Sequence, residues 1–287
     1  MRRLIVNADD FGLTSGVNRG IAKGNSEGII TSATVMANSR AFEEAVQVAK
    51  LQTSLKTGCH VVLIDGAPLT RQASTLTTNS SRFRSSLKEF AAAAVRKQIS
   101  ASEIQQEAEA QICRIQAASL NVTHVDSHKH THMFPHVLRP VLRAAKTCGV
   151  RAVRNPFEPW RCWPRSVVFT SPAMWLRAAG VGCFQMFASA FRKAIAEENM
   201  ITTDGTIGIV ATGKLDLPLL LSTLESLPEG TWELVCHPGY SDADLLAAGT
   251  RLTQSREVEF EALTSPEVKS LIARRGIGLI SYAVLCS

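Results

Sequence analysis

Histidines carry the strongest chemical signal in this chain. Five of its seven histidines lie in the run T-H-V-D-S-H-K-H-T-H-M-F-P-H, residues 123–136, and the other two are His60 and His237. Imidazole is a common metal ligand and can exchange a proton near neutral pH. Because a zinc-like catalytic site takes three protein ligands and leaves one position open, the five histidines of the run must serve different purposes.

Two histidines and one carboxylate form the metal site that we predict. His60 lies in one predicted strand, His128 lies just past the end of the next, and Asp9-Asp10 ends the first. Such a ligand set suits Zn²⁺, Co²⁺, Ni²⁺ or Fe²⁺ better than Mg²⁺, which prefers oxygen ligands. The spacing leaves open whether Asp9 or Asp10 is the ligand. The other carboxylate can then act as base toward water at the metal.

The remaining polar residues of the histidine run have weaker assignments. His124 lies inside a predicted strand, and we expect it to be a core histidine or to support a ligand. Asp126 either orients a ligand imidazole through its second ring nitrogen or caps a turn. His130 and His132 continue into the loop, where we expect substrate contacts, and we expect His136 to be a surface residue at the start of a helix.

His237 stands in the motif C-H-P-G-Y, residues 236–240. The Pro and Gly predict a tight turn after a strand. From such a turn the imidazole could reach the reacting centre from the far side and act as general acid. The alternative is a turn histidine that is bonded to backbone.

These residues require a fold that gathers strand ends. Eight short, β-branched apolar runs predict strands at 4–8, 31–37, 58–64, 121–126, 150–154, 206–211, 232–236 and 276–282. Helical patterns predict helices at 41–51, 102–119, 135–148 and 216–227, the second with a capping box that begins at Ser102. Repeated strand-then-helix units indicate a parallel sheet. Their number favours an α/β fold of the distorted (β/α) TIM-like barrel type over an open sheet, with the active site at the carboxyl ends of the strands.

We expect a single domain over residues 1–287 with two excursions. The excursion near 65–99 combines a polar loop with an Ala-rich helix and is either an insertion or an interface. The excursion near 156–200 contains Trp160, Trp163 and Trp175. This aromatic segment forms either a membrane-facing lip or a helical pair packed on the barrel, and we favour the helical pair.

Composition excludes several classes of protein. The net charge of +6, with a pI near 9.1, comes from scattered Lys and Arg residues and does not indicate nucleic acid as a partner. The seven cysteines contain no C-x-x-C motif, so we expect reduced thiols in a cytoplasmic protein. We expect neither a signal peptide nor a spanning helix, and the inner face of the membrane is the alternative location.

Five motifs together resemble one family, the YdjC-like carbohydrate deacetylases. They are N-A-D-D-F-G (7–12), G-C-H (58–60), H-V-D-S-H-K-H-T-H-M-F-P (124–135), R-N-P (154–156) and C-H-P-G-Y (236–240). The resemblance implies a distorted barrel, a homodimer, and a metal-dependent hydrolase that removes acetyl groups from N-acetylglucosamine units. Family members are often assigned Mg²⁺, whereas the ligand types here favour Zn²⁺ or a similar ion. Cys59 departs from the commoner motif, in which Leu or Met precedes the histidine.

The resemblance also implies a role for each motif residue. It assigns Asp10, His60 and His128 as metal ligands, Asp9 as catalytic base and His237 as proton donor. Under this mechanism, Arg154 and His132 hold sugar hydroxyls or the amide. The substrate is an N-acetylated chitooligosaccharide or a glycolipid such as an N-acetylglucosaminyl hopanoid, the latter with peripheral membrane contact. The competing interpretations are an amidohydrolase-type metal hydrolase and a non-catalytic barrel that binds glycans or lipids.

Overall fold

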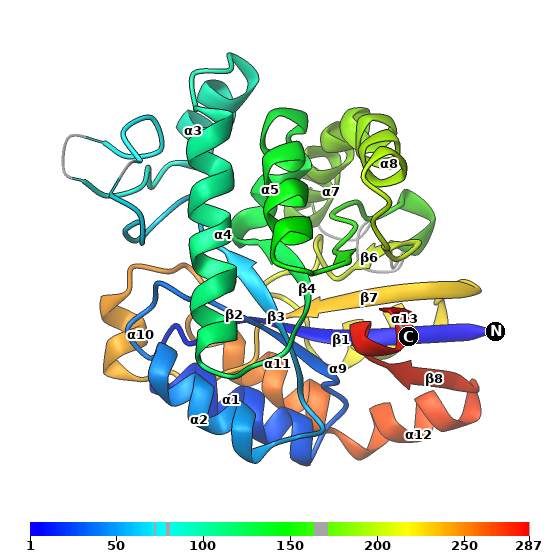
Figure 1. Ribbon diagram of the computed structural model, residues 1–287. Helices are drawn as coiled ribbons and strands as arrows, with labels where there is room; N and C mark the ends of the chain where they lie inside the picture. Colours follow the sequence, from blue (N-terminus) through cyan, green and yellow to red (C-terminus); the bar gives the residue numbers. More distant parts are fainter. Residues whose placement is uncertain (72, 79–80, 164–171, 287) are drawn as a thin grey trace.

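The computed structural model describes residues 1–71, 73–78, 81–163 and 172–286 (Figure 1). Residues 72, 79–80 and 164–171 of the two predicted excursions lie outside this description, as does residue 287. The described residues form a curled, parallel, eight-stranded sheet flanked by helices, which confirms the predicted barrel-like α/β fold. Its strands are β1 (Arg2–Phe11), β2 (Ser32–Val35), β3 (Lys56–Val61), β4 (Val122–Ser127), β5 (Ala152–Val153), β6 (Gly205–Ile207), β7 (Gly230–Cys236) and β8 (Ile277–Ile280).

The sheet curls around β1 in the order β5-β4-β3-β2-β1-β7-β6. Along β1, β7 pairs with Arg2–Ala8 on one edge. On the other edge β8 pairs with the first residues of β1, and β2 pairs with the last ones. The carboxyl end of β1 therefore lies between β2 and β7, where a barrel places its active site. A parallel bridge between Ala152 and Ile201 brings the two edges of the sheet toward each other.

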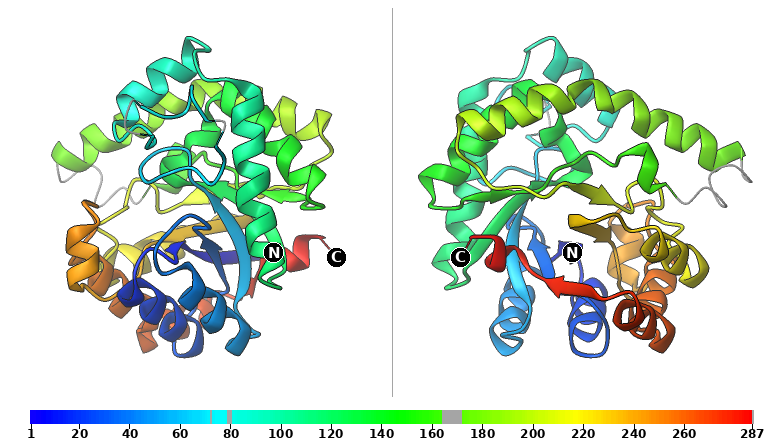
Figure 2. Two further views of the ribbon diagram at one scale, coloured as in Figure 1. Left: turned by 60° about the vertical axis from the view of Figure 1, so that its left-hand side comes forward. Right: turned by 90° about the vertical axis from the view of Figure 1, so that its right-hand side faces the viewer.

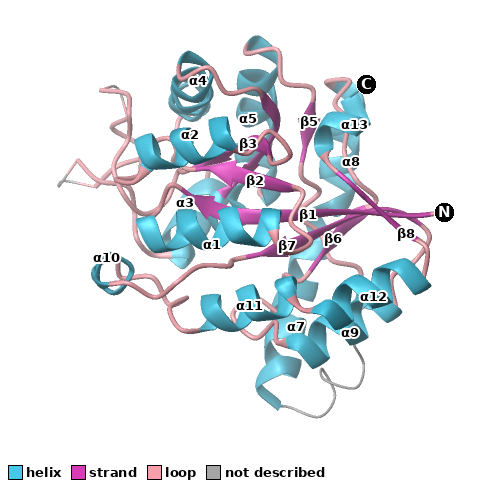
Figure 3. Ribbon diagram, turned by 90° about the horizontal axis from the view of Figure 1, so that it is seen from below, coloured by secondary structure: helices cyan, strands magenta, loops and turns pink. Residues whose placement is uncertain are grey.

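Helices cover the outside of the curled sheet (Figures 1 and 3). The helices of the first half are α1 (Ser15–Ser26), α2 (Phe42–Leu51), α3 (Leu87–Val95), α4 (Ala101–Ala117) and α5 (Pro135–Thr147). Those of the second half are α7 (Pro172–Cys183), α8 (Ala188–Glu197), α9 (Leu217–Glu225), α10 (Ala243–Ala247), α11 (Ser255–Thr264), α12 (Pro266–Arg274) and α13 (Tyr282–Cys286). Figure 1 shows α1, α2, α9, α11 and α12 below the sheet.

The predicted capping residue of α4 was wrong by two positions. The hydroxyl of Ser100, rather than Ser102, accepts a hydrogen bond from the backbone N–H of Glu103 at the start of this helix. Ser100-Ala-Ser-Glu103 also has the spacing of a capping box, so two overlapping patterns competed in the sequence. The Glu103 side chain bonds to Ser74 and Thr75 and ties the first excursion to α4.

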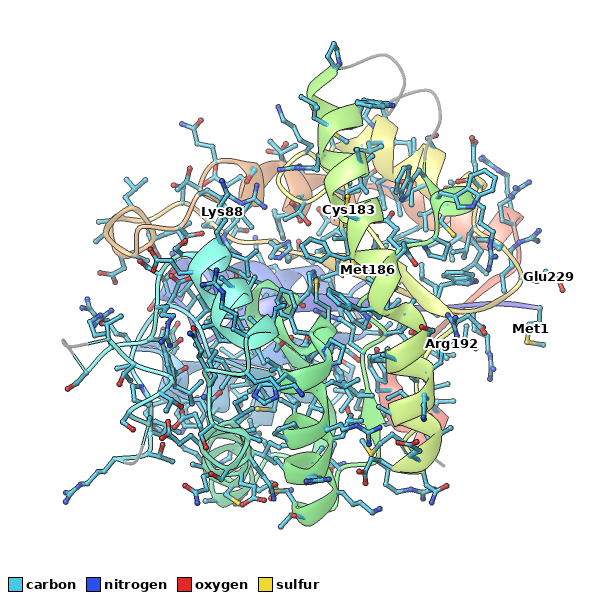
Figure 4. All side chains as sticks on the ribbon, turned by 90° about the horizontal axis from the view of Figure 1, so that it is seen from above. Met1, Lys88, Cys183, Met186, Arg192 and Glu229 are labelled. Carbon is cyan, nitrogen blue, oxygen red and sulfur yellow. The ribbon has the colours of Figure 1, made fainter. Side chains whose placement is uncertain are left out.

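The second excursion is mostly helical from Pro172 onward. Helices α7 and α8 run across the molecule above the sheet, joined by a short 3-10 turn at Phe184–Phe187 (Figure 2, right, yellow-green). Phe184 and Phe187 pack edge-on against Phe134 at the start of α5. Met186 is 74% exposed on the outer surface (Figure 4).

Within the described residues, no helix is both long and apolar enough to cross a membrane.

Candidate active site

A bulge at the end of β1 turns two neighbouring carboxylates toward the same site. The pairing of β1 with β2 is irregular between Ala8 and Phe11, and Asp10 has a φ of 65°. Asp is among the few residues other than Gly that adopt this left-handed conformation with modest strain. Adjacent residues of a regular strand point to opposite faces. The bulge removes this restriction, so Asp9 and Asp10 are both buried among the site residues.

Asp10, His60 and His128 place three potential ligand atoms together. Asp10 Oδ1 lies 3.5 Å from His60 Nε2 and 3.3 Å from His128 Nδ1, and the two ring nitrogens lie 3.3 Å apart. Ligands bound at 2.0–2.1 Å around a tetrahedral ion are about 3.3–3.4 Å apart. The three side chains therefore have the spacing of a compact divalent-metal site, and each of them was predicted as a ligand.

Two further carboxylates orient the histidine rings. Asp126 Oδ1 lies 2.7 Å from His60 Nδ1, and Asp65 Oδ2 lies 3.4 Å from His128 Nε2. When each outer nitrogen carries the proton, the inner nitrogens of both rings present lone pairs toward Asp10. This arrangement is the usual support for metal-bound histidines. Of the two roles considered for Asp126, the structure shows the contact to a ligand imidazole.

The electrostatics of the site favour a cation. Five buried acidic residues and two buried arginines meet there, namely Asp9, Asp10, Asp126, Glu233 and Glu259 with Arg154 and Arg256. Burial raises the pKa of Glu233, against the opposing influence of Arg154. The five acidic groups outnumber the two guanidinium groups, and this excess of acidic groups favours a bound cation. Asp10 Oδ1 is buried without a hydrogen-bond partner among the described residues, and an unpaired carboxylate oxygen is costly to bury.

Asp9, His60 and Asp126 form a second compact group of potential ligands. Its two carboxylates are already paired with the guanidinium group of Arg154. Arg154 donates from Nη1 and Nη2 to the two oxygens of Asp9, at 2.8 and 2.6 Å. Its Nη1 also lies 2.7 Å from Asp126 Oδ2. The guanidinium therefore neutralises both carboxylates. Burial alone would raise the pKa of Asp9, but the adjacent Arg154 outweighs burial and lowers it.

Replacing Arg154 by Met is expected to destabilise the protein by about 3–5 kcal/mol, because removal of one partner leaves buried charges uncompensated. The side chain is fully buried and also bonds Glu233 through Nε at 2.8 Å. Urea unfolding followed by circular dichroism measures the change. Arg143→Met is the matched control, since Arg143 is 57% exposed with a 3.8 Å ion pair and should cost less than about 0.5 kcal/mol. Equal effects in both variants would contradict this role of Arg154.

His237 lies next to Asp9, on the turn that follows β7. Its Nε2 is 3.9 Å from Asp9 Oδ2, and its Nδ1 is 3.8 Å from Glu259 Oε2. Glu259 also accepts a 2.6 Å hydrogen bond from the backbone N–H of His237, which fixes the turn. Burial lowers the pKa of His237, although Glu259 and Asp9 oppose this change. The side chain is 11% exposed, so part of the ring can be reached from solvent.

The other histidines of the run lie in different environments. His132 is fully buried, with Nδ1 against the Ser127 hydroxyl and Nε2 against the Arg154 carbonyl. His130 is half-buried, and its Nδ1 has no hydrogen-bond partner in the described part of the chain. His124 is a core residue whose ring stacks on Tyr282 with a centroid distance of 3.8 Å. His136, expected on the surface, is half-buried and its Nε2 lies 2.7 Å from the Ile99 carbonyl.

The glycine of the G-C-H motif makes room for His124. A Cβ atom at Gly58 would lie 2.4 Å from His124 Cε1, so any larger residue would displace the ring. Because Gly58 and His60 share β3, displacement of His124 would also disturb the strand that carries a ligand. This motif thus has one residue for packing and one for the candidate metal site.

Several site residues were not predicted from the sequence. Arg256 and Glu259 lie on α11, which was not predicted as a helix, and Arg256 Nη2 donates a 2.6 Å bond to Asp10 Oδ2. Asp65 appeared only as the first residue of an excursion. Glu233 has one detectable signal, since it is an acidic residue inside the apolar run W-E-L-V-C. A buried strand seldom contains an unpaired acid.

Known proteins match this chain over nearly its whole length. The sequence profile of the family described as YdjC-like protein matches residues 3–274. A protein of Brevibacillus brevis named carbohydrate deacetylase is 32% identical over 284 residues, which cover 99% of each chain. A protein of Vibrio parahaemolyticus with the same name is 30% identical, and the match covers 99% of this chain and 97% of that one.

A solved structure has the same fold. It is a protein of Enterococcus faecalis named for cellobiose-phosphate cleavage, with a TM-score of 0.79 and 24% sequence identity. The superposition covers 99% of this chain and 98% of that chain. The two chains therefore share the overall fold.

Proposed function

Because this chain belongs to the YdjC-like protein family, and because relatives that match it over 99% of its length are named carbohydrate deacetylases, we propose that it is a metal-dependent carbohydrate N-deacetylase. The reaction hydrolyses the acetamido group of an N-acetylglucosamine unit and releases acetate. The observation that carries this proposal is the convergence of Asp10, His60 and His128 beside a second carboxylate, Asp9.

The three ligand residues would hold one divalent ion, with Zn²⁺ favoured by their nitrogen and oxygen donors. When bound, such an ion supplies Lewis acidity to the acetyl carbonyl and to the attacking water. Asp9 accepts the proton of that water as the carbon–oxygen bond forms. Arg154 holds both oxygens of Asp9 and keeps the carboxylate ionised.

His237 donates a proton to the departing nitrogen. Its Nε2 faces Asp9, so the proton that Asp9 takes up has a short path toward the imidazole. Glu259 holds the turn and stabilises the imidazolium that forms transiently. A neutral resting state of His237 is consistent with its lowered pKa, because the proton arrives during the reaction.

The predicted sugar-binding residues differ in solvent exposure, and this difference separates their roles. Arg154 and His132 have no exposed side-chain surface, and their polar atoms are bonded within the protein. We therefore replace their predicted substrate contacts with a positioning role at the ends of β4 and β5. His130 remains the candidate for a sugar contact, because it is only half-buried and its Nδ1 has no hydrogen-bond partner among the described residues.

Acetate release tests the proposed function. The purified protein is stripped with a chelator, reloaded with Zn²⁺ or Mg²⁺, and incubated with diacetylchitobiose or an N-acetylglucosaminyl lipid in detergent micelles. We expect equal amounts of acetate and new primary amine from the metal-loaded protein and none from the stripped protein. Absence of acetate with both substrates and both metals would contradict a deacetylase. The preferred substrate separates the soluble from the lipid-linked alternative, and the homodimer and the cytoplasmic location stay predictions.

Metal affinity is expected to rise with pH up to about 9. Burial opposes charge on His128, but the neighbouring carboxylates of Asp10 and Asp65 prevail and raise the pKa of His128 to about 9. Below that pH the ion must displace a proton, so binding releases about one proton and weakens about tenfold per pH unit. Calorimetric titrations in buffers of different ionisation enthalpy measure the released proton. Binding without proton release at pH 7 would exclude His128 as a ligand.

A further inference from the structure

Two cysteines outside the proposed active site face each other across a pair of helices. Cys113 lies one turn before the end of α4, and Cys148 follows the last residue of α5. Their sulfur atoms are 3.7 Å apart. Cys113 is exposed and Cys148 is half-buried, so both can be reached from solvent. Helices α4 and α5 pack side by side (Figures 1 and 2).

The surrounding contacts hold this thiol pair in register. Gln116 Nε2 donates a 2.8 Å hydrogen bond to the Cys148 carbonyl and joins the end of α5 to α4. On the other side of α5, Lys146 lies 3.5 Å from Glu198, which follows α8. A disulfide bond is about 2.05 Å long, so the sulfurs need to approach by only about 1.6 Å. Side-chain rotation can supply that movement without separating the helices.

We propose that Cys113 and Cys148 form a reversible intramolecular disulfide and thus make a redox modification site. Its substrates are low-molecular-weight disulfides such as oxidised glutathione. The thiolate of Cys113 attacks one glutathione sulfur, the glutathione disulfide bond breaks, and reduced glutathione leaves with a proton. The thiolate of Cys148 then attacks the Cys113 sulfur and releases a second glutathione. The two cysteines together lose two electrons and two protons, and both pass to the two glutathione molecules.

The order of attack follows from exposure. Burial and the neighbouring Cys113 raise the pKa of the Cys148 thiol to about 12, so Cys148 is a poor first nucleophile. Once Cys113 is in the mixed disulfide, it no longer raises the pKa of the Cys148 thiol, and only burial and Glu109 still do. The second step therefore becomes easier after the first.

The disulfide lies far from the proposed active site. Helix α5 begins beside the histidine loop, and its 13 residues span about 20 Å at about 1.5 Å per residue. Cys148 is at the opposite end. The bond closes a chain segment of 35 residues (148 − 113), and closing a segment of this length restricts the unfolded chain. We therefore expect oxidation to stabilise the fold and to leave acetate release unchanged.

The test uses the reduced full-length protein with oxidised glutathione under nitrogen. Alkylation and peptide mass spectrometry should show a Cys113–Cys148 link without retained glutathione, and the melting temperature should rise on the order of 5–10 °C. Dithiothreitol should reverse both changes. Cys113→Ser and Cys148→Ser should abolish the link and the shift. The matched control Cys183→Ser, at an exposed cysteine on α7 (Figure 4), should retain both.

Three outcomes would overturn the proposal. The first is that both thiols stay free at oxidising glutathione ratios. The second is that a glutathione adduct persists on Cys113 although Cys148 is present. The third is that Cys113 links two chains instead of closing within one. Because none of these measurements depends on catalysis, the result is independent of the proposed deacetylase activity.

Discussion

Replacing His60 by Ala is expected to abolish both metal uptake and turnover. The imidazole contributes Nε2 to the ligand triad, while its Nδ1 contacts Asp126. Loss of a partner that only supports a ligand typically costs about 10–100-fold in metal affinity. Loss of the ligand itself should exceed about 100-fold. Metal content after dialysis and acetate release from diacetylchitobiose measure the two effects.

A second ligand variant separates chemistry from folding. His60 is fully buried, so His60→Ala also leaves Asp126 without one of its partners. His128 lies at the rim with 19% of its side chain exposed, and His128→Ala should lose the metal with less effect on stability. His136→Ala is the matched control. Within the described residues, the hydrogen bond of this side chain is to the Ile99 carbonyl, outside the proposed metal site. Full metal content in both ligand variants would refute the proposed site.

Asp9→Asn is expected to retain the metal and to lower kcat by about 10²–10⁴-fold, the usual contribution of a general base. Asparagine has nearly the shape of aspartate but cannot accept the proton of the attacking water. Asp9 lies outside the ligand triad, so metal content should be unchanged. Stopped or discontinuous acetate assays at saturating substrate measure kcat, and elemental analysis measures the metal.

Folding must be followed in the same variant, because the amide faces Arg154. Arg154 keeps contacts to Asp126 and Glu233, so the cluster remains partly paired. Asp244→Asn, on the surface of α10, serves as the control for a change of one charge. Activity within about twofold of wild type in a folded, metal-loaded Asp9→Asn protein would exclude Asp9 as the base.

The strand ends were predictable because their residues differ from ordinary surface composition. Asp9, Asp10, His60, Asp126 and His237 each follow or end an apolar β-branched run. In a parallel barrel such ends must meet. Eight strands were predicted at close to their observed positions, and the resemblance to a family then assigned individual roles that spacing had left open.

The residues that support the site were harder to predict, because their roles depend on tertiary contacts between distant segments of the chain. Helix α1 contains Gly16, Gly20 and Gly24, and glycine disfavours helices. The structure gives the reason, since a Cβ at Gly20 would lie 2.5 Å from Gly239. Close packing against the turn that carries His237 therefore overrides local propensity. Arg256 gives no sequence signal at all, because an arginine in a charged helix is ordinarily a surface residue.

Because the end of β1 is irregular, the number of residues in this strand decides which carboxylate reaches which partner. Asp9 and Asp10 differ by one position, and the left-handed turn at Asp10 decides which of them meets the histidines and which meets Arg154. Inserting one residue before them would move Asp9 into the place of Asp10, and deleting one would move Asp10 into the place of Asp9. Either change leaves one of the two positions without a carboxylate. Inserting or deleting one residue in β1 should therefore harm activity more than substituting any one of the aliphatic side chains of this strand.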